Sequence, residues 1–357
     1  MSLDDIRTQI DAADEELVRL LNHRAALSIE VGKRKAGQAK SRWYAPERER
    51  EVFERLETLL AKEGGALPKA DLHAIYREIL SSSRTLQRPL VIAFWGTPGT
   101  YTHIAATGKF GSSSSFVPCD TIVDVFSTVE HERADYGVIP VENSTEGIVH
   151  YTLDNLQQTS LRVCAEIYVR IRHNLVTHAT ELSQIERVYT GPQPLAQCRQ
   201  WLSRHLPQVE FVEALPTTKG VERAKNDPHG AAIASDLAAQ LQEVPILVPH
   251  IEDDARNTTR FLVIGDNDPP PTGRDKTSVI FAVRNEPGGL ARALRYFEEE
   301  EVNLTMITSR PAKHTPWEYV QFIDLTGHIT EKSVQAALDK LKDHCLSVTV
   351  LGSYPEA

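Results

Sequence analysis

The sequence predicts a multidomain protein of three parts: an all-α part over residues 1–88, a two-lobed α/β part over residues 89–268 and a ferredoxin-like α+β part over residues 276–357. Three observations predict this division. Apolar residues recur at helical spacing in the first part, short apolar runs alternate with helical stretches from Leu90, and Pro269–Pro271 interrupt the chain before the last part. At about 150 residues per domain, 357 residues suit two or three domains.

The composition argues against several classes of function. The 49 Asp and Glu residues outnumber the 39 Lys and Arg residues, so we expect no nucleic-acid partner, because such proteins need a basic surface. The chain has no apolar run of about 18 residues and a first segment that is charged throughout, so we expect no membrane span and a cytoplasmic location. The four cysteines lack metal-ligand spacing, so we expect free thiols and no metal.

The first part contains three predicted helices. Residues 3–36 carry apolar residues at alternating steps of three and four, which is the spacing of a face buried against other helices. A second helix begins at Pro46, which suits a first helical turn, and stops at Gly64. A third helix is predicted from about Pro68 to Gln87.

Arg24 falls on the apolar face of the first helix, where a guanidinium needs an anion. The anion could be a glutamate of a neighbouring helix or a bound ligand. Lys35 lies eleven residues further, in almost the same direction around the helix, and Ser83 and Gln87 are polar positions on the apolar face of the third helix. Polar groups from two buried faces would converge, as they do in the ligand sites of helix bundles.

Arg7 lies roughly 25 Å along the helix axis from Arg24, at a rise of about 1.5 Å per residue. This is too far for both side chains to hold one small anion. If Arg7 belongs to the site, a second chain must supply it, so the sequence predicts a homodimer or a larger homo-oligomer.

The first part resembles the all-helical class of chorismate mutases over residues 1–88, through IRTQIDAADEELVRLLNHRAALSIEVGKRK, PERERE and SSSRTLQ. The resemblance implies a rearrangement of chorismate to prephenate by positioning and electrostatics, without covalent intermediate, metal or cofactor. Some members have Asp where this chain has Ala45. The implied roles are carboxylate clamps for Arg7 of the second chain, Arg24 and Arg48, donors to the ether oxygen for Lys35 and Gln87, a partner of the ring hydroxyl for Glu49, and pocket lining for Ser83.

The middle part alternates between short strands and helices, which predicts a mostly parallel sheet wrapped by helices. Connections near residues 165 and 250 suit two lobes with a cleft between them. Polar residues gather in segments 96–102, 140–145 and 257–261, each next to a predicted strand. Because ligands of open α/β sheets bind beyond strand ends, these segments form a candidate site, although Glu142 could instead make a cap or hinge hydrogen bond.

The middle part resembles prephenate dehydratases over about residues 90–265, through GTPGTYTHIAA, VIPVENSTEGIV, YTGPQPLAQC, AAIAS and NTTRFLVIG. The resemblance implies a periplasmic-binding-protein-like pair of lobes and conversion of prephenate to phenylpyruvate with loss of CO2 and the ring hydroxyl. Thr259 would donate a hydrogen bond to the leaving group in a dry site, and Arg260 would place a carboxylate. Many members have His where this chain has Gly191. The other implied substrate contacts are Thr100, Glu142, Asn143, Ser144 and Phe261.

The last part follows the order βαββαβ and resembles the ACT domains that bind amino acids. Two segments carry the resemblance and would hold phenylalanine as an allosteric effector: Pro287, Gly288, Gly289 and Leu290 in the first, and Ser309, Arg310 and Pro311 in the second. Glycine lets the backbone approach a bound amino acid closely. The second segment usually begins with Glu, where this chain has Thr308, and the domain could instead serve only to pair subunits.

Together the three resemblances imply a bifunctional enzyme of phenylalanine biosynthesis that phenylalanine inhibits by feedback. Two alternatives stay open: arogenate dehydratase activity in the middle part, or a catalytically silent amino-acid sensor. The polar sets around Lys35 and Thr259 argue against a sensor, because a protein that only binds needs neither set.

Overall fold

The computed structural model describes residues 1–37, 43–312 and 319–357. Contacts between residues divide the chain into two compact units, which we describe separately. The first comprises Met1–Val91 with Lys109–Ser115, and the second comprises Ile92–Gly108 with Phe116–Ala357. Within the described residues, no helix is both long enough and apolar enough to cross a membrane.

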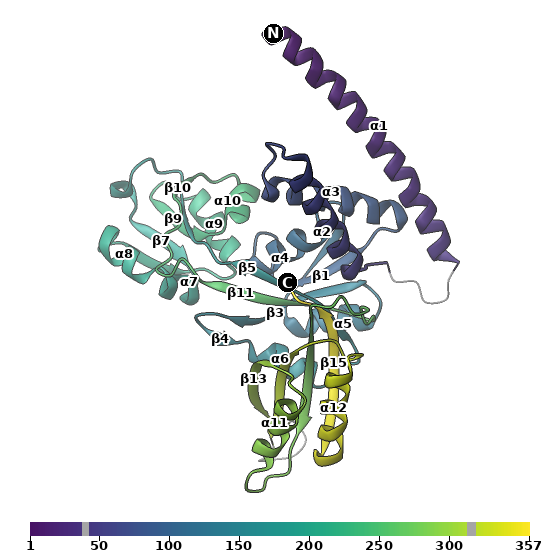
Figure 1. Ribbon diagram of the computed structural model, residues 1–357. Coiled ribbons are helices and arrows are strands. Elements are labelled where there is room, and N and C mark those ends of the chain that lie inside the picture. The colour runs from purple at the N-terminus through teal and green to yellow at the C-terminus, as the bar shows by residue number, and fades with distance from the viewer. Residues whose placement is uncertain (38–42, 313–318) are drawn as a thin grey trace. The chain divides into compact units, whose positions relative to one another are not determined.

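The first unit is helical, as predicted. Its helices are α1 (Leu3–Ala36), α2 (Pro46–Glu63) and α3 (Lys69–Gln87), and Figure 1 shows α1 as one uninterrupted helix. The Ser2 side chain caps α1 through a reciprocal pair of hydrogen bonds with Asp5, and Gly64 ends α2 in the left-handed conformation. Because these signals are local, the ends of the helices could be predicted from short segments.

The first unit has a small core and a large exposed apolar face. Val52 and Leu56 of α2 pack against Leu72 of α3. In contrast, most of the apolar side chains of α1 are exposed, for example Leu17 at 54% and Leu20 at 58%. The predicted burial of this face is therefore not achieved within one chain.

The second unit contains two lobes, and the first lobe is built on a six-stranded sheet. The order is β2-β1-β3-β11-β5, with β4 paired to β3. The strands are β1 (Val91–Trp95), β2 (Ser115–Cys119), β3 (Tyr136–Asn143), β4 (Gly147–Ile148), β5 (Arg162–Arg170) and β11 (Thr258–Gly265). The helices of this part of the chain are α4 (Tyr101–Phe110), α5 (Ile122–Glu130) and α6 (His150–Leu156).

The second lobe has a five-stranded sheet of order β10-β6-β9-β7-β8. Its strands are β6 (Asn174–Val176), β7 (Arg187–Thr190), β8 (Glu210–Glu213), β9 (Gly230–Ala234) and β10 (Ile246–Val248). Its helices are a 3-10 turn (Leu182–Gln184), α7 (Pro192–Gln197), α8 (Arg199–His205), α9 (Thr217–Lys225) and α10 (Asp236–Gln242). Residues 171–173 and 249–257 connect the two lobes, close to the predicted positions, and the long strands β5 and β11 lead toward them (Figure 1).

The prediction of a mostly parallel sheet is wrong. Strand β1 pairs in parallel with β3, and β7 pairs in parallel with β8 and β9, but β11 is antiparallel to both β3 and β5. The cause is the double crossing between lobes. Strand β5 leaves the first lobe and β11 returns to it, so these neighbours must run in opposite directions.

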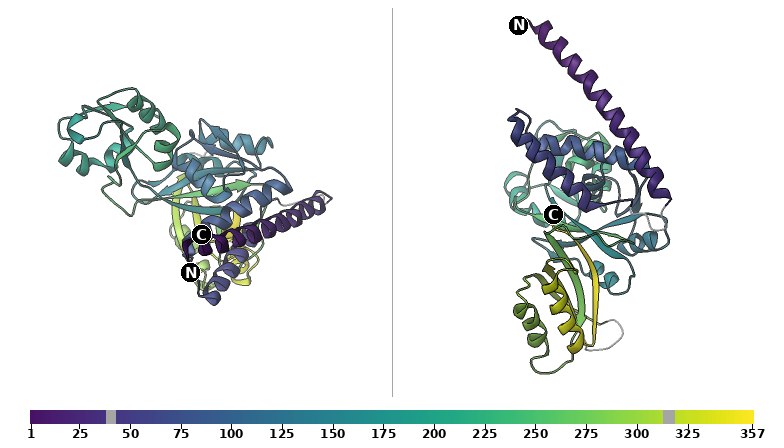
Figure 2. Two further views of the ribbon diagram at one scale, coloured as in Figure 1. Left: turned by 90° about the horizontal axis from the view of Figure 1, so that it is seen from above. Right: turned by 45° about the vertical axis from the view of Figure 1, so that its right-hand side comes forward.

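The C-terminal part forms the predicted ferredoxin-like layer of helices on an antiparallel sheet. The sheet order is β13-β14-β12-β15, and both helices lie on the same face of it (Figure 2). Phe281 and Leu325 of the sheet pack against Phe297 and Leu338 of the helices. The elements are β12 (Asp275–Ala282), α11 (Gly289–Glu299), β13 (Leu304–Pro311), β14 (Tyr319–Thr326), α12 (Lys332–His344) and β15 (Ser347–Pro355).

Strand β15 lies directly against β5 of the first lobe. A Cβ atom on Gly352 would overlap the Val163 carbonyl oxygen, so the two backbones touch at this glycine. The Arg162 guanidinium donates to the Val350 carbonyl at the same junction. The C-terminal sheet is thus packed closely against the sheet that carries β11.

Candidate functional site

In the first unit, Arg24 lies at the contact between α1 and α3. Its Nη1 atom donates to the Ser83 hydroxyl and lies 3.5 Å from the Ile79 carbonyl oxygen. Burial lowers the pKa of Arg24. Among the described residues, no carboxylate forms an ion pair with this guanidinium, so the alternative of a glutamate partner within the chain is not realised.

Lys35 and Gln87 lie near the same contact. A Cβ on Gly32 would be 2.8 Å from the Cα of Gln87, so α1 and α3 approach to backbone distance one turn before Lys35. The Oε1 atom of Gln87 is buried and has no hydrogen-bond partner in the part of the chain that the structure describes. The half-buried Lys35 has its Nζ 6.0 Å from the centroid of the Trp43 ring.

The other predicted mutase residues make no contact with Arg24 among the described residues. Arg7 is exposed near the start of α1, where it pairs with Asp4 at 3.4 Å. Arg48 is exposed in the first turn of α2, where Nη1 lies 2.7 Å from Glu51.

Glu49 accepts a hydrogen bond from Arg84, a residue that the sequence analysis did not single out. The buried Arg84 side chain also donates to the Phe110 carbonyl over 2.6 Å, and burial lowers its pKa. The sequence offered one sign of this role, because Arg84 is a charged residue on the buried face of the segment SSSRTLQ. Glu49 would have to share its carboxylate between Arg84 and a ligand.

In the second unit, three polar side chains meet where β3 ends beside the start of β11. Asn143 pairs in register with Thr259. The Nδ2 atom of Asn143 lies 2.8 Å from Oγ1 of Thr259 and 2.8 Å from Oδ1 of Asn257. All three residues are buried. The structure thus brings together Asn143 and Thr259 with Asn257, which lies two residues before Thr259 in the predicted segment 257–261.

The other predicted residues of this region do not contact the Thr259 hydroxyl among the described residues. Ser144 is exposed and joins the same strand ends, since its Oγ accepts from the Thr258 backbone N–H over 3.0 Å. Glu142 is paired in register with Arg260 and lies on the opposite face of the strand from Asn143. The Thr100 hydroxyl donates to the Thr97 carbonyl over 2.8 Å.

The glycine turn before α4 contacts the second lobe. Gly99 adopts φ +95, and a Cβ there would be 3.0 Å from the Cα of Ala238 in the second lobe. Thr97 and Thr218 share a hydrogen bond of 2.7 Å across the same contact. The turn therefore fixes one lobe against the other in this structure.

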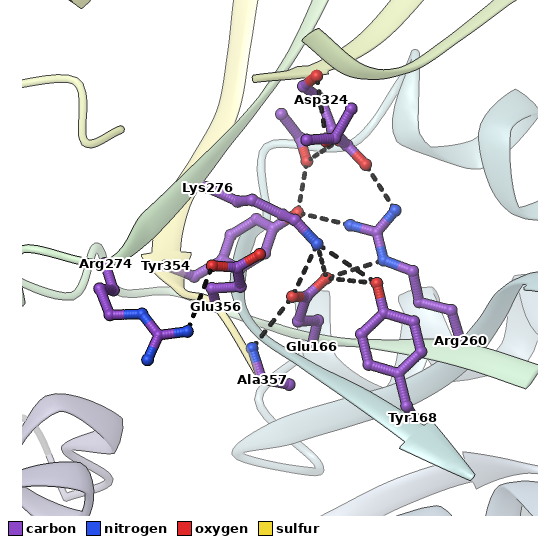
Figure 3. Close-up of polar contacts among 11 residues, drawn as sticks. Glu166, Tyr168, Arg260, Arg274, Lys276, Asp324, Tyr354, Glu356 and Ala357 are labelled. Atoms are coloured by element: carbon purple, nitrogen blue, oxygen red, sulfur yellow. Dashed lines mark hydrogen bonds and ion pairs between the residues drawn. The ribbon is translucent and has the colours of Figure 1, made fainter. Parts of the chain in front are cut away.

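Arg260 requires a correction. Its three donor atoms are engaged by protein groups: Nε with Glu166 at 2.8 Å, Nη1 with Asp324 at 2.5 Å and Nη2 with the Tyr354 hydroxyl at 3.0 Å. Figure 3 shows Glu166 between Arg260 and Lys276, whose Nζ lies 2.9 Å from Glu166. Successive strand residues point to opposite faces, so Arg260 cannot join Thr259 at one ligand. The structure places Arg260 in a buried ion cluster that joins the first lobe to the C-terminal sheet.

The ion cluster stabilises the charged form of Arg260. Burial alone would lower the pKa of Arg260, but Tyr354, Asp324 and Glu166 raise it well above the ordinary value. The cluster contains two carboxylates and two cations, so its charges balance. Such a set is costly to break because removal of one member leaves a buried charge without compensation.

Phe261 also requires a correction, because its side chain is only 1% exposed and belongs to the core. It can support the strand that carries Thr259, but it has no surface to offer a substrate.

A cavity of about 280 Å³ lies beside Asn257. It is close to the lower end of the range for small-molecule sites, which is about 300–1,000 Å³. Four of its lining residues are acidic: Glu146, Glu252, Asp253 and Asp254. Backbone N–H groups of His173, Gln200, Trp201 and Arg256 hydrogen-bond to three of these carboxylates. The cavity is nevertheless acidic and would repel the carboxylates of a dianionic ligand.

The two predicted effector segments emerge at the same end of the C-terminal sheet. Arg310, Val320 and Ala282 lie in one row across the strands, and the glycine turn follows Ala282 closely. Gly288 has φ +77, and a Cβ on Gly289 would be 2.8 Å from the Arg284 carbonyl oxygen, so the turn requires both glycines.

Within the second segment, Arg310 forms a two-pronged ion pair with Asp154 of α6, with Nη2 2.8 and 2.9 Å from the two carboxylate oxygens. Ser309 donates to Oε1 of Gln321 over 2.6 Å. Pro311 ends β13, and Pro287 accepts from Arg292 through its carbonyl over 3.2 Å. Leu290 packs on the domain core.

The cysteines are free thiols, as predicted. Burial raises the pKa of Cys164 to about 12, so this thiol stays protonated at neutral pH.

Comparison with known proteins covers the whole chain. Residues 6–88 match the family model for chorismate mutase type II, residues 92–269 match prephenate dehydratase, and residues 277–343 match the ACT domain. Two similar proteins are named bifunctional chorismate mutase/prephenate dehydratase. The protein from Aquifex aeolicus is 45% identical over 99% of this chain and 98% of its own length. The protein from Pseudomonas aeruginosa is 40% identical over 99% of this chain and 97% of its own length.

Among solved structures, the chain is similar to a prephenate dehydratase from Arthrobacter aurescens in complex with L-Phe. The TM-score is 0.70 and the identity 33%, over 75% of this chain and 90% of the other.

Proposed function

The chain belongs to the family of bifunctional chorismate mutase/prephenate dehydratases, and we propose that two separate sets of side chains carry its two reactions. It rearranges chorismate to prephenate and converts prephenate to phenylpyruvate in phenylalanine biosynthesis. Its ACT domain fits feedback regulation by phenylalanine. We assign the mutase to residues 1–88, the dehydratase to residues 89–268 and the regulatory domain to residues 276–357 of a cytoplasmic enzyme.

The mutase site centres on Arg24, Lys35 and Gln87. Arg24 lacks an anionic partner among the described residues and would hold a substrate carboxylate. Lys35 and the Gln87 amide would donate to the ether oxygen as its bond to carbon breaks, because charge builds up on that oxygen in the transition state. An amide donates at any pH, which makes Gln87 independent of protonation. Ser83 orients Arg24, and Glu49 would bind the ring hydroxyl.

A second copy of the chain would complete this site. The exposed apolar face of α1 is the observation that supports it, since side chains such as Leu17 and Leu20 need a cover that one chain does not provide. A partner helix on this face would bring its Arg7 toward the far end of the site, with Arg48 as a further clamp on the substrate. The enzyme would then be a homodimer or a larger homo-oligomer.

The dehydratase site centres on the Thr259 hydroxyl, and its contact with Asn143 is the observation that carries the assignment. Loss of CO2 breaks a carbon–carbon bond, whose electron pair completes the aromatic ring and expels the ring hydroxyl as hydroxide. The dianion becomes the phenylpyruvate anion, CO2 and hydroxide, and hydroxide takes its proton from solvent. Thr259 would stabilise the departing oxygen by a hydrogen bond. Ser144, Thr100 and Glu142 remain candidates for contacts with other parts of prephenate.

The regulatory site would lie between the glycine turn Pro287–Leu290 and the segment that contains Arg310. Several polar contacts link the regulatory domain to the first lobe, among them Arg310 with Asp154 and Arg260 with Asp324. Arg260 directly follows Thr259 in β11. A shift of the regulatory sheet on phenylalanine binding would therefore reach the catalytic strand through a single peptide unit.

Product analysis with chorismate tests the proposal. Wild-type enzyme should form phenylpyruvate, and Thr259→Val, which replaces the hydroxyl with a methyl group, should accumulate prephenate. We expect the variant to lose about 100-fold or more in kcat for added prephenate. Substantial dehydratase activity in Thr259→Val would remove Thr259 from the mechanism, whereas loss of chorismate turnover in this variant would refute separate sites.

A further inference from the structure

The amide of Asn143 has only one possible orientation. Its Oδ1 atom lies 3.0 Å from the backbone nitrogen of Thr145 and 3.0 Å from that of Glu146. A backbone N–H can only donate, so the atom that faces both must be the oxygen. The usual ambiguity between oxygen and nitrogen of an amide side chain is removed by these two fixed donors.

The Nδ2 atom of Asn143 must then donate on its other side. Its two hydrogens meet two atoms at 2.8 Å, Oδ1 of Asn257 and Oγ1 of Thr259. Since Nδ2 has no lone pair to offer, both neighbours must accept. The direction of hydrogen bonding therefore runs from the Thr145 turn through Asn143 to Asn257 and Thr259.

This direction determines what the Thr259 hydroxyl can do. A hydroxyl has one hydrogen and two lone pairs, and Thr259 uses a lone pair toward Asn143. Among the described residues, no acceptor lies within hydrogen-bonding distance of its hydrogen. The hydrogen remains available to a ligand, whereas reversed polarity at Asn143 would capture it.

We propose that Asn257 is a positioning residue of the dehydratase, which together with Asn143 holds the Thr259 hydroxyl as a donor to the departing ring hydroxyl. The inference rests on the proposed function of Thr259 and adds a residue and a hydrogen-bond direction to it. Asn257 is 1% exposed and lines the cavity beside the strand end. It acts by accepting the second hydrogen of Asn143, which adds to the two backbone donors in holding that amide in place.

Three variants test the direction of the bonds, with kcat and KM for added prephenate as readout. Asn143→Asp keeps the shape but turns the donor into an acceptor, so it should capture the Thr259 hydrogen and lower kcat about 100-fold with little change in KM. Asn257→Asp adds the same charge next to the site but keeps an acceptor for Asn143. Asn257→Leu removes the acceptor, and we expect it to lower kcat about 10-fold.

The charge-matched pair makes the test decisive. Asn257→Asp should retain kcat within about threefold of wild type, which rescues the loss seen in Asn257→Leu. Urea unfolding of each variant shows whether the second unit is still folded. Equal losses of kcat in Asn143→Asp and Asn257→Asp would overturn the proposal, because charge and not bond direction would then be the cause. An active Asn143→Asp would also overturn it.

A different result is expected if Thr259 has no role in the dehydratase reaction. In that case Thr259→Val would keep its dehydratase activity whatever the Asn variants do. If Thr259→Val is inactive while Asn257→Leu equals wild type, only the role of Asn257 is wrong.

Discussion

Arg260 and Asp324 connect the catalytic strand to the regulatory sheet, with Nη1 of the first 2.5 Å from Oδ2 of the second. Both side chains are buried, and Glu166 and Lys276 complete a cluster of balanced charge. The cluster joins the ACT domain to the first lobe at the residue that directly follows Thr259. Loss of one charge there would leave a buried charge without compensation.

Asp324→Asn should destabilise the second unit. The change keeps the shape of the side chain but leaves the cluster with an uncompensated cation, which costs roughly 3–5 kcal/mol of unfolding free energy in a buried pair. Urea denaturation of the full chain measures the loss. Asp339→Asn is the matched control, because Asp339 pairs with Lys342 on an exposed helix face. Equal stability of the two variants would show that the cluster does not hold the sheets together.

Asp154→Asn should strengthen phenylalanine binding. Asp154 occupies the guanidinium of Arg310, which lies in a segment that we propose binds phenylalanine, so the substitution removes a competitor and frees Arg310 for the effector. The pair is partly exposed, so the gain should be modest, about fivefold in Kd. Calorimetric titration with phenylalanine measures it, with Asp343→Asn at an exposed position of α12 as control. Unchanged or weaker binding in Asp154→Asn would contradict competition between Asp154 and the effector.

The second unit should lose stability as the pH falls, because His173 is buried in its neutral form. Burial lowers its pKa below the ordinary 6.5, and its Nε2 atom is 2.8 Å from Oε1 of Gln197. Below pH 6.5 the unfolded chain binds a proton that the folded chain refuses, so stability is present above this pH and is lost as the pH falls. The loss can reach about 1.4 kcal/mol per pH unit.

The measurement is the unfolding free energy of wild type and His173→Gln at pH 7, 6 and 5. Glutamine can still donate to Gln197 but cannot gain a proton, so the variant should show a flatter dependence on pH. His150→Gln serves as control, because His150 is exposed at the start of α6. Parallel curves for wild type and His173→Gln would rule out His173 as the cause.

The helices and the C-terminal layer could be predicted because their signals are local. Pro46 and Gly64 mark the ends of α2, and the βαββαβ order of the last part follows from alternating runs of a few residues. The pairing direction of β11 could not be predicted in this way. It depends on where the chain crosses between the lobes, which no short segment encodes.

For the candidate sites, the sequence predicted the motifs but not the direction in which each side chain points. The motif that contains Thr259 was recognised, but motif membership does not show which face of a strand a side chain occupies. Arg260 was therefore assigned to the substrate, although its partners Glu166, Asp324 and Tyr354 lie in three other strands. Asn257 lay within the predicted segment 257–261 but was given no role, because the role that we propose for it depends on the orientation of the Asn143 amide.

The central claim is that the two reactions use separate sites, one around Lys35 and one around Thr259. Lys35→Ala should abolish prephenate formation and spare the dehydratase, while its exposed neighbour Lys33→Ala should keep both activities.

The most direct test mixes Lys35→Ala with Thr259→Val and supplies chorismate. Each variant alone should form no phenylpyruvate, whereas the mixture should form it, because prephenate made by the second variant is consumed by the first. A mixture that stays inactive while both variants remain folded would contradict two independent sites.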